Sequence, residues 1–316
     1  MAEETVRRSV AVVIPSYQCA EYLPNTLDSV LAQTLPPTEV FVIDDGSTDD
    51  TPRLVKRYGS RIHYVRQANA GVAVARNHGL GLVKAPWVMF LDADDILEPQ
   101  ALEALLTEAD GDVVVYGDKT TMVEDGTLLT RVVNRDCTGP APSAARACFG
   151  GAAFEPGCAI VPRRLALELG GFDQRYAPCE DRHFWVRCGA LVEFRHVGEP
   201  VMRYRVRPGS HSKNRTRQVY ASVKTRLDLL EWFRSRHLAV FETQPEVEEV
   251  IGADLEAVYW GREWPVVDAL LELATQYGID SPRIHSVRKM RRIPPLIWTL
   301  KDALDRERAK LRSGPS

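Results

Sequence analysis

The chain has 316 residues, of which 45% are hydrophobic and 26% charged, and its formal net charge is −3. These values are typical of a globular protein with one large α/β domain and an appendage, and they give no indication of nucleic-acid binding. The N-terminus is charged and lacks the apolar stretch of a signal peptide, and no apolar run is long enough to span a bilayer. No two of the six cysteines have C-x-x-C spacing, so we expect no structural zinc. We expect a cytoplasmic protein, and in that compartment cysteines are ordinarily reduced thiols.

Strand and helix patterns alternate over the first hundred residues. Short β-rich runs at 9–14, 40–43, 62–65 and 87–91 are separated by helical apolar patterns, the clearest at 20–33 and 71–83. This order predicts an α/β fold with a mostly parallel sheet flanked by helices.

Residues 112–205 have a mixed pattern, with a hairpin around Asp125-Gly126 and a helix at 180–188. After residue 216 the pattern becomes helical, with helices predicted at 218–236, 245–259 and 265–277. We therefore expect a catalytic domain at 1–216 and a helical C-terminal region at 217–316.

Polar or conformationally special residues follow each of the first four strands. They are Pro15-Ser16-Tyr17, Asp44-Asp45-Gly46, Gln67-Ala68-Asn69 and Asp92-Ala93-Asp94-Asp95. Because ligands of parallel α/β sheets bind at the carboxyl ends of the strands, we expect these residues around one crevice.

The three carboxylates of the fourth group repel one another if they lie close together. Such a cluster raises a pKa or recruits a cation, and Mg²⁺ or Mn²⁺ prefers carboxylates combined with the oxygens of a substrate phosphate. The alternative is a solvated turn whose acids cap a helix. A phosphate-binding P-loop is absent, and Gly79-Leu80-Gly81 lies inside a predicted helix, so it is no dinucleotide fingerprint.

Several motifs occur together in a fixed order along the chain. They are Val12-Val13-Ile14-Pro15-Ser16-Tyr17, Asp44-Asp45-Gly46-Ser47, Asn69-Ala70-Gly71, Ala75-Arg76-Asn77, Asp92-Ala93-Asp94-Asp95, Gly170-Gly171-Phe172-Asp173 and Cys179-Glu180-Asp181. This set resembles the family 2 glycosyltransferases, which have the Rossmann-like GT-A fold, and the resemblance covers about two thirds of the chain, residues 9–215. It implies an inverting, metal-assisted enzyme that transfers a sugar from a nucleoside-diphosphate donor to an acceptor hydroxyl.

The resemblance also implies roles for single residues. It assigns the nucleotide and sugar-donor side to Pro15, Tyr17, Asp45, Asn69, Gly71, Arg76, Asn77 and Asp92. It assigns a divalent Mn²⁺ or Mg²⁺ ion to Asp94 and the general base to Asp181. His211, in a basic loop after a predicted strand, is a further candidate ligand of the metal or the diphosphate.

Other interpretations are open at this stage. Arg76 could pair with an acid rather than bind the sugar donor, and Glu180 could pair with Arg182 or Arg187 or orient Asp181. Two other activities compete: a sugar-1-phosphate nucleotidyltransferase, although the Gly-rich basic loop of those enzymes is missing, and a non-catalytic nucleotide-sugar-binding scaffold.

The acceptor could be a glycan, a lipid-linked molecule or a small molecule, and the chain could form a homo-oligomer. Ten Lys and Arg residues lie between 283 and 312, against three acids. This tail is either a solvated helical face or a peripheral contact with an anionic membrane.

Overall fold

The computed structural model describes residues 9–151, 153–207, 215–241 and 244–292. The chain divides into two compact units, Met1–Val240 and Phe241–Ser316. The first unit holds the sheet and every described candidate residue.

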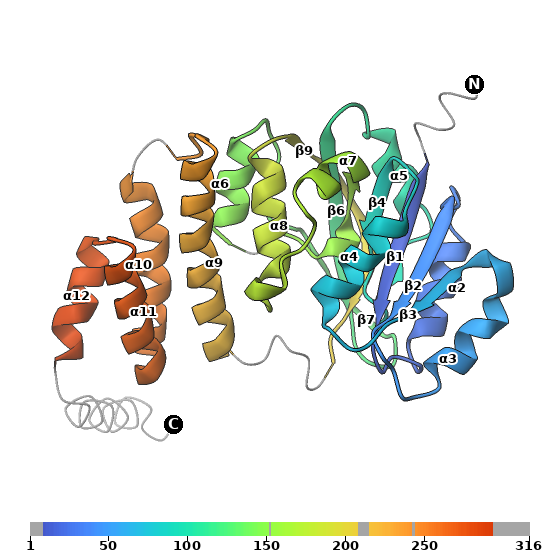
Figure 1. Ribbon diagram of the computed structural model, residues 1–316, viewed down its shortest axis with the longest axis horizontal. Coiled ribbons are helices and arrows are strands. Elements are labelled where there is room, and N and C mark those ends of the chain that lie inside the picture. The colour runs from blue at the N-terminus through green and yellow to red at the C-terminus, as the bar shows by residue number, and fades with distance from the viewer. Residues whose placement is uncertain (1–8, 152, 208–214, 242–243, 293–316) are drawn as a thin grey trace, which may run out of the picture. The chain divides into compact units, whose positions relative to one another are not determined.

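Four parallel strands form one half of the sheet, in the order β3-β2-β1-β4 (Figure 1). Their bounds are Val10–Ser16 for β1, Glu39–Asp44 for β2, His63–Arg66 for β3 and Trp87–Phe90 for β4. β1 is buried along its whole length, because strands covered on both faces carry continuous apolar runs rather than alternating ones. The helices that follow these strands are α2 (Leu23–Leu31), α3 (Thr51–Leu54) and α4 (Val72–Leu82).

The other half of the sheet is mixed in direction. β8 (Ala159–Pro162) runs antiparallel to β4 and to β6 (Val113–Met122), and β6 runs parallel to β9 (Glu193–Arg205). β7 (Leu128–Val132) forms the predicted hairpin with β6, and β5 (Ile96–Leu97) pairs with β9. The expected α/β fold is therefore confirmed, with its parallel part confined to the first four strands and the β6–β9 pair.

Further helices of the first unit follow β5. Their bounds are Ala101–Thr107 for α5, Ser143–Phe149 for α6, Arg163–Glu168 for α7, Glu180–Gly189 for α8 and Arg215–Ser235 for α9. Aromatic side chains are buried between the sheet and α8. Phe90 meets Phe172 edge to face at 4.9 Å, and Phe172 stacks on Phe184 at 4.4 Å, so β4 and α8 share one aromatic core.

α9 belongs to the first unit rather than to a separate appendage. Val223, Leu227 and Phe233 are buried, and Arg226 Nε donates to the carbonyl oxygen of Phe149 at the end of α6 (2.7 Å). The first unit therefore extends beyond the domain boundary that the sequence pattern suggested at 216.

Within the described part of the second unit, residues 241 and 244–292, there are three helices: α10 (Gln244–Trp260), α11 (Trp264–Gln276) and α12 (Pro282–Arg291). Ser281 caps α12 by accepting a hydrogen bond from the Ile284 amide, and Ile284 and Val287 are buried. Among the residues that the structure describes, no helix is long and apolar enough to cross a membrane.

Candidate active site

The carboxyl ends of β1, β2 and β4 meet at one edge, as the strand order requires. The Asp45 amide donates to the Ser16 carbonyl oxygen (2.8 Å), and the Leu91 amide donates to the Val13 carbonyl oxygen (3.0 Å). Pro15 lies within β1 and is buried, whereas Tyr17 directly after the strand is 51% exposed. An exposed ring at this edge is free to stack on a planar ligand.

Asp45 holds the next strand end in place. Its buried carboxylate accepts hydrogen bonds from Gln67 Nε2 (2.8 Å) and from the amides of Ala70 (2.9 Å) and Gly71 (2.8 Å). Gly71 has a φ of +94° and precedes α4, and Asn69 is exposed. Because a carboxylate accepts about four hydrogen bonds, Asp45 keeps room for one further donor group.

Arg76 links two motifs that lie far apart in the sequence. Its Nη2 is 2.7 Å from Asp92 Oδ1 at the end of β4, and its Nη1 is 3.2 Å from Glu180 Oε1 at the start of α8. The guanidinium is buried, lies 5.1 Å from the centre of the Phe172 ring, and keeps a raised pKa because both acids outweigh the effect of burial. Glu180 therefore pairs with Arg76, and neither Arg182 nor Arg187 forms this contact.

Asp94 and Asp95 are held by two arginines near the end of β9. Arg207 Nη2 is 2.6 Å from Asp94 Oδ2, and the amide of Arg205 donates to Asp95 Oδ1 (2.9 Å). Arg205 Nε also donates to the Asp94 carbonyl oxygen (2.9 Å). Burial, followed by the charge of Asp92, raises the pKa of Asp94, and burial raises the pKa of Asp95 still further.

Sequence analysis did not single out Arg205 or Arg207. Arginines alternate at positions 203, 205 and 207, a period of two that places side chains on the same face of a strand. That pattern was the available signal, but its acidic partners lie more than a hundred residues earlier in the chain.

Asp181 lies in the first turn of α8, beside Glu180. Burial, followed by the charge of Glu180, raises the pKa of the Asp181 carboxyl to about 6, against the opposing charges of Arg76 and Arg182. A carboxylate with this pKa is ionised at neutral pH and is a stronger base than an ordinary aspartate.

Two polar side chains near the site form hydrogen bonds with the backbone of residues 169–172. Asn77 Nδ2 donates to the Phe172 carbonyl oxygen (2.6 Å), and Asn77 Oδ1 accepts from the Phe172 amide (2.8 Å). Arg187 donates to the carbonyl oxygens of Leu169 and Gly171 (both 2.6 Å). Both residues therefore fix the segment that leads into α8.

The acidic residues fit a divalent cation only in part. Asp92 and Asp94 supply the carboxylate oxygens that Mg²⁺ and Mn²⁺ prefer, and both are already paired with guanidinium groups, so their positions attract positive charge. Within the described ranges, no three His, Cys, Asp or Glu side chains form a ready-made metal site. The remaining ligands would therefore be oxygens of the substrate and water, and His211 lies outside the described residues.

The sequence model of Glycosyl transferase family 2 matches residues 11–170, half of the chain. The chain belongs to this family. The match includes the ends of β1, β2, β3 and β4, and it stops just before Gly171 and the α8 acids.

Two curated relatives of this family 2 chain are bacterial polysaccharide synthases. Chondroitin synthase and hyaluronan synthase of Pasteurella multocida are each 37% identical over 196 residues, which cover 60% of this chain and 20% of each synthase. The chain thus spans about a fifth of the length of these relatives.

Two solved structures share the fold. Staphylococcus aureus TarS 1–349 in complex with UDP-GlcNAc has a TM-score of 0.58 and 20% identity, covering 90% of this chain and 91% of that one. The mannosyltransferase PcManGT from Pyrobaculum calidifontis, in complex with GDP-Man and Mn²⁺, has a TM-score of 0.58 and 21% identity, covering 93% and 84%. These similarities confirm the fold expected from the sequence.

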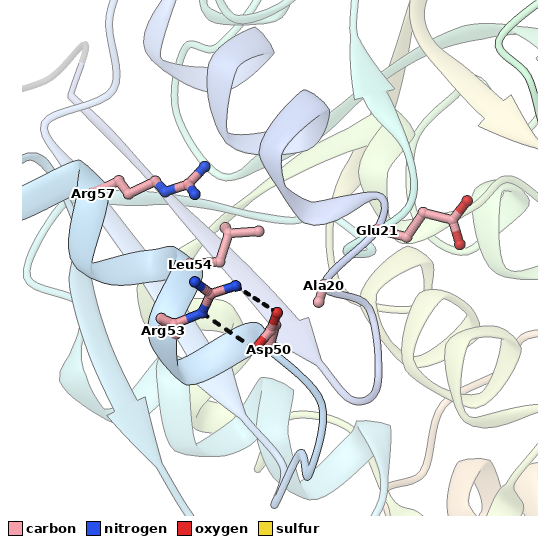
Figure 2. A pocket seen from close by; sticks show the side chains of 6 residues that line it. All are labelled: Ala20, Glu21, Asp50, Arg53, Leu54 and Arg57. Atoms are coloured by element: carbon pink, nitrogen blue, oxygen red, sulfur yellow. Dashed lines mark hydrogen bonds and ion pairs between the residues drawn. The ribbon is translucent and has the colours of Figure 1, made fainter.

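A cavity of about 280 Å³ lies beside α2 and α3 of the family 2 unit (Figure 2). Its lining residues are Ala20, Glu21, Asp50, Arg53, Leu54 and Arg57. Arg53 pairs with Asp50 across 2.7 Å, and none of the candidate site residues that the structure describes lines this cavity.

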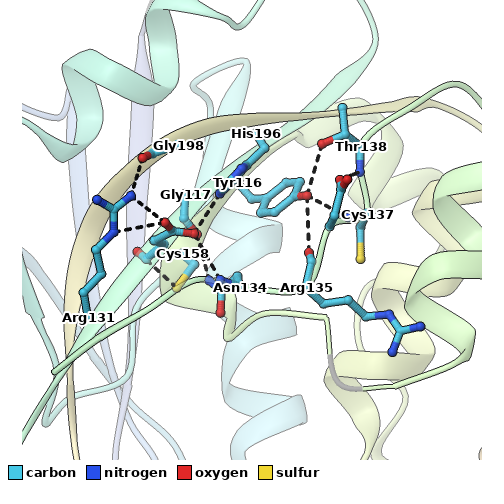
Figure 3. A network of polar contacts seen from close by, with 12 residues as sticks. Tyr116, Gly117, Arg131, Asn134, Arg135, Cys137, Thr138, Cys158, His196 and Gly198 are labelled. Atoms are coloured by element: carbon cyan, nitrogen blue, oxygen red, sulfur yellow. Dashed lines mark hydrogen bonds and ion pairs between the residues drawn. The ribbon is translucent and has the colours of Figure 1, made fainter.

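A buried polar network anchors the chain that follows β7 (Figure 3). Asp118 of β6 accepts hydrogen bonds from Arg131 Nη2 (2.8 Å) and the Asn134 amide (3.0 Å), and it lies 2.8 Å from His196 Nε2. Tyr116 stacks on His196 at 4.8 Å. These contacts fix β6 and β9 to each other. β9 ends at Arg205, and Arg207 follows two residues later.

Proposed function

We propose that this chain transfers a sugar from a nucleoside-diphosphate donor to an acceptor hydroxyl, with inversion at the sugar carbon. The bridge from Asp92 through Arg76 to Glu180 is the observation that carries the proposal. It joins the acidic strand end, where a sugar donor would bind, to the helix start that bears a carboxylate poised as a base.

The sugar donor would occupy the edge formed by the first four strand ends. Tyr17 offers an exposed ring to the nucleotide base, Asp45 has room for one more hydrogen bond, and Asn69 and Gly71 border the same edge. The complexes of TarS with UDP-GlcNAc and of PcManGT with GDP-Man support a nucleotide sugar as the ligand.

Asp94 would hold a divalent cation, with Asp92 beside it. When bound, the cation neutralises the diphosphate that leaves the sugar carbon. The Mn²⁺ in the PcManGT complex supports this part of the proposal. Arg205 keeps the Asp94 backbone in position through the carbonyl oxygen.

Asp181 would take the proton from the acceptor hydroxyl as that oxygen attacks the sugar carbon. Such positioned base catalysis accelerates a reaction by about 10²–10⁴-fold. Attack opposite the leaving diphosphate inverts the anomeric centre. The names of the chondroitin and hyaluronan synthases support a glycan acceptor, although lipid-linked and small acceptors fit the same chemistry.

We assign this activity to the first compact unit and propose that the second is an accessory region. The basic tail would give peripheral contact with anionic membranes. Arg283, Arg288 and Arg291 pair with acids of their own unit, so contact would depend on the other basic residues, most of them beyond the described ranges. Pelleting with anionic but not neutral vesicles, reversed by salt, is the expected result.

Thermal unfolding with a panel of nucleoside diphosphates, with and without Mn²⁺, tests the proposed function. A ligand at about 100 times its Kd raises the free energy of unfolding by about 2.7 kcal/mol. We expect one nucleotide to stabilise the protein mainly with metal, and Asp94→Asn to remove the metal-dependent part. Asp181→Asn should retain nucleotide binding and lose transfer. A folded protein that binds no nucleotide would contradict the proposal, and nucleotide binding without transfer by the unaltered chain would favour a scaffold.

A further inference from the structure

Arg207 occupies the carboxylate that the proposed function gives to the metal ion. Its Nη2 lies 2.6 Å from Asp94 Oδ2, and its guanidinium lies 5.2 Å from the centre of the Tyr22 ring. Tyr22 is fixed in turn, because its hydroxyl donates to Glu124 Oε1 (2.7 Å) in the turn between β6 and β7. The guanidinium is thus held between a carboxylate and an anchored aromatic face.

The two arginines on this ring differ in how firmly they are held. Arg205 lies 5.0 Å from the centre of the Tyr22 ring, is buried, and donates to the carbonyl oxygens of Asp94 (2.9 Å) and Glu124 (2.6 Å). Arg207 keeps 32% of its side chain exposed, and among the described residues its polar contact is the pair with Asp94. Arg207 can therefore leave its carboxylate without breaking the backbone contacts that hold the acidic segment.

We propose that Arg207 is an internal competitor for the divalent cation, which has to displace this guanidinium from Asp94 before it can bind. The inference rests on the metal role that the proposed function gives to Asp94. A guanidinium and a hard dication need the same carboxylate oxygens, and their like charges exclude joint occupation at hydrogen-bonding distance.

This competition has a consequence for the order of binding. A free cation meets a carboxylate that is already neutralised, and few further protein ligands lie beside it. A cation that arrives with a nucleoside diphosphate brings phosphate oxygens as additional ligands. Because Arg207 weakens binding of the free ion, we expect these phosphate oxygens to be needed for tight binding of the metal.

Binding of Mn²⁺ alone to the full chain, measured by calorimetry or by electron paramagnetic resonance of the free ion, tests the inference. We expect Arg207→Gln to bind Mn²⁺ about five- to tenfold more tightly than the unaltered protein, the range for a partly exposed ion pair with an added aromatic contact. Arg207→Lys keeps the charge and should stay close to the unaltered affinity. Tyr22→Leu keeps the net charge, removes the aromatic surface, and should tighten binding by a smaller factor.

Arg203→Gln is the matched control for the loss of one positive charge from the same segment of the chain. Arg203 lies two residues before Arg205 and pairs with Glu98 (2.8 Å) instead of with the acidic segment. The Mn²⁺ affinity of the Arg203→Gln variant should equal that of the unaltered protein. Equal tightening in the Arg203 and Arg207 variants, or no tightening in a folded Arg207→Gln protein, would overturn the inference.

A second titration separates this inference from the proposed function. Mn²⁺ is titrated in the presence of saturating UDP or GDP, with Asp94→Asn as the comparison. If nucleotide-dependent Mn²⁺ binding requires Asp94 but Arg207→Gln leaves free-ion affinity unchanged, only the role of Arg207 fails. If neither protein binds Mn²⁺ with any nucleotide, the metal assignment fails and the inference fails with it.

Discussion

At the scale of single residues, Arg76 connects two acidic motifs of the candidate site. One guanidinium contacts both Asp92 and Glu180, which are separated from it by 16 and 104 positions. Sequence analysis named the residues of both motifs and left open whether Arg76 pairs with an acid. It could not predict that one arginine serves both motifs, because that depends on how α4, β4 and α8 pack.

Arg76→Gln should lower both stability and activity. The change leaves Glu180 buried without its cation, and breaking a buried ion pair typically costs about 3 kcal/mol. We also expect kcat/KM to fall about 100-fold or more, because the two acidic motifs lose their common anchor. Urea unfolding and sugar-transfer assays measure the two effects.

Arg53→Gln provides the control for Arg76→Gln, since Arg53 forms an exposed pair with Asp50. It should change neither stability nor transfer measurably. Retention of full activity by Arg76→Gln would mean that the bridge is dispensable for the reaction.

The raised pKa of Asp181 predicts an acid limb in the pH dependence of transfer. The base acts only when ionised, so kcat/KM should fall as the pH drops through about 6. A pH–rate profile whose acid limb lies near pH 4 would assign the proton transfer to another group.

The same pKa predicts the pH dependence of stability with a defined sign. An aspartate whose pKa is raised on folding from 3.8 to about 6 binds its proton more tightly in the folded state, so ionisation destabilises the fold. Asp181→Asn, which stays neutral, should therefore be more stable than the unaltered protein at pH 8. This advantage should shrink as the pH falls through 6 and disappear below about 4. Denaturant unfolding at several pH values measures it.

At the scale of helices and strands, the segment before α8 depends on the absence of a side chain at one position. Gly171 has a φ of +67°, and a Cβ there would lie 2.1 Å from Asn77 Oδ1. Gly170 has a similar φ of +73°, but nothing lies within 4 Å of the Cβ it would gain. These adjacent glycines share a left-handed backbone conformation and differ in the space that a side chain would have.

Gly171→Ala should destabilise the first unit by about 3 kcal/mol or more, because the backbone strain adds to a steric overlap with Asn77. Gly170→Ala should cost only about 1 kcal/mol, from the backbone conformation alone. Chemical denaturation compares the two variants. Equal losses would show that Asn77 moves aside without cost.

β1, β2 and β4 could be predicted because each contains a continuous apolar run, and α2 and α4 because each has a helical period bounded by polar residues. β3 has a weaker pattern, since its four residues His63–Arg66 include two charged or polar side chains. The arrangement of β5, β6, β8 and β9 could not be predicted. These strands pair across long sequence separations and in both directions, so their order depends on tertiary packing rather than on local pattern. For the same reason the roles of Arg205 and Arg207 could not be predicted, because their partners Asp94 and Asp95 follow β4, far away in the sequence.

At the scale of the whole molecule, the first compact unit carries the complete described site. A fragment of residues 1–240 should fold cooperatively and bind nucleotide without the second unit. A fragment of residues 1–216 would lose α9 and expose the apolar surface that covers Val223, Leu227 and Phe233. We expect it to aggregate or to unfold at a markedly lower temperature. Calorimetry measures the unfolding temperature of both fragments. Equal values would mean that the folded unit ends before α9.

The contact between Asn77 and Gly171 also restricts the order in which these two positions can change during evolution. A side chain at 171 has no space while the Asn77 amide occupies it, whereas a smaller residue at 77 opens that space at the loss of two hydrogen bonds. The substitution at 77 therefore has to come first, and the reverse order passes through a poorly folded intermediate. Descendants of an ancestor with this pair should carry a non-glycine residue at 171 only where Asn77 has already been lost.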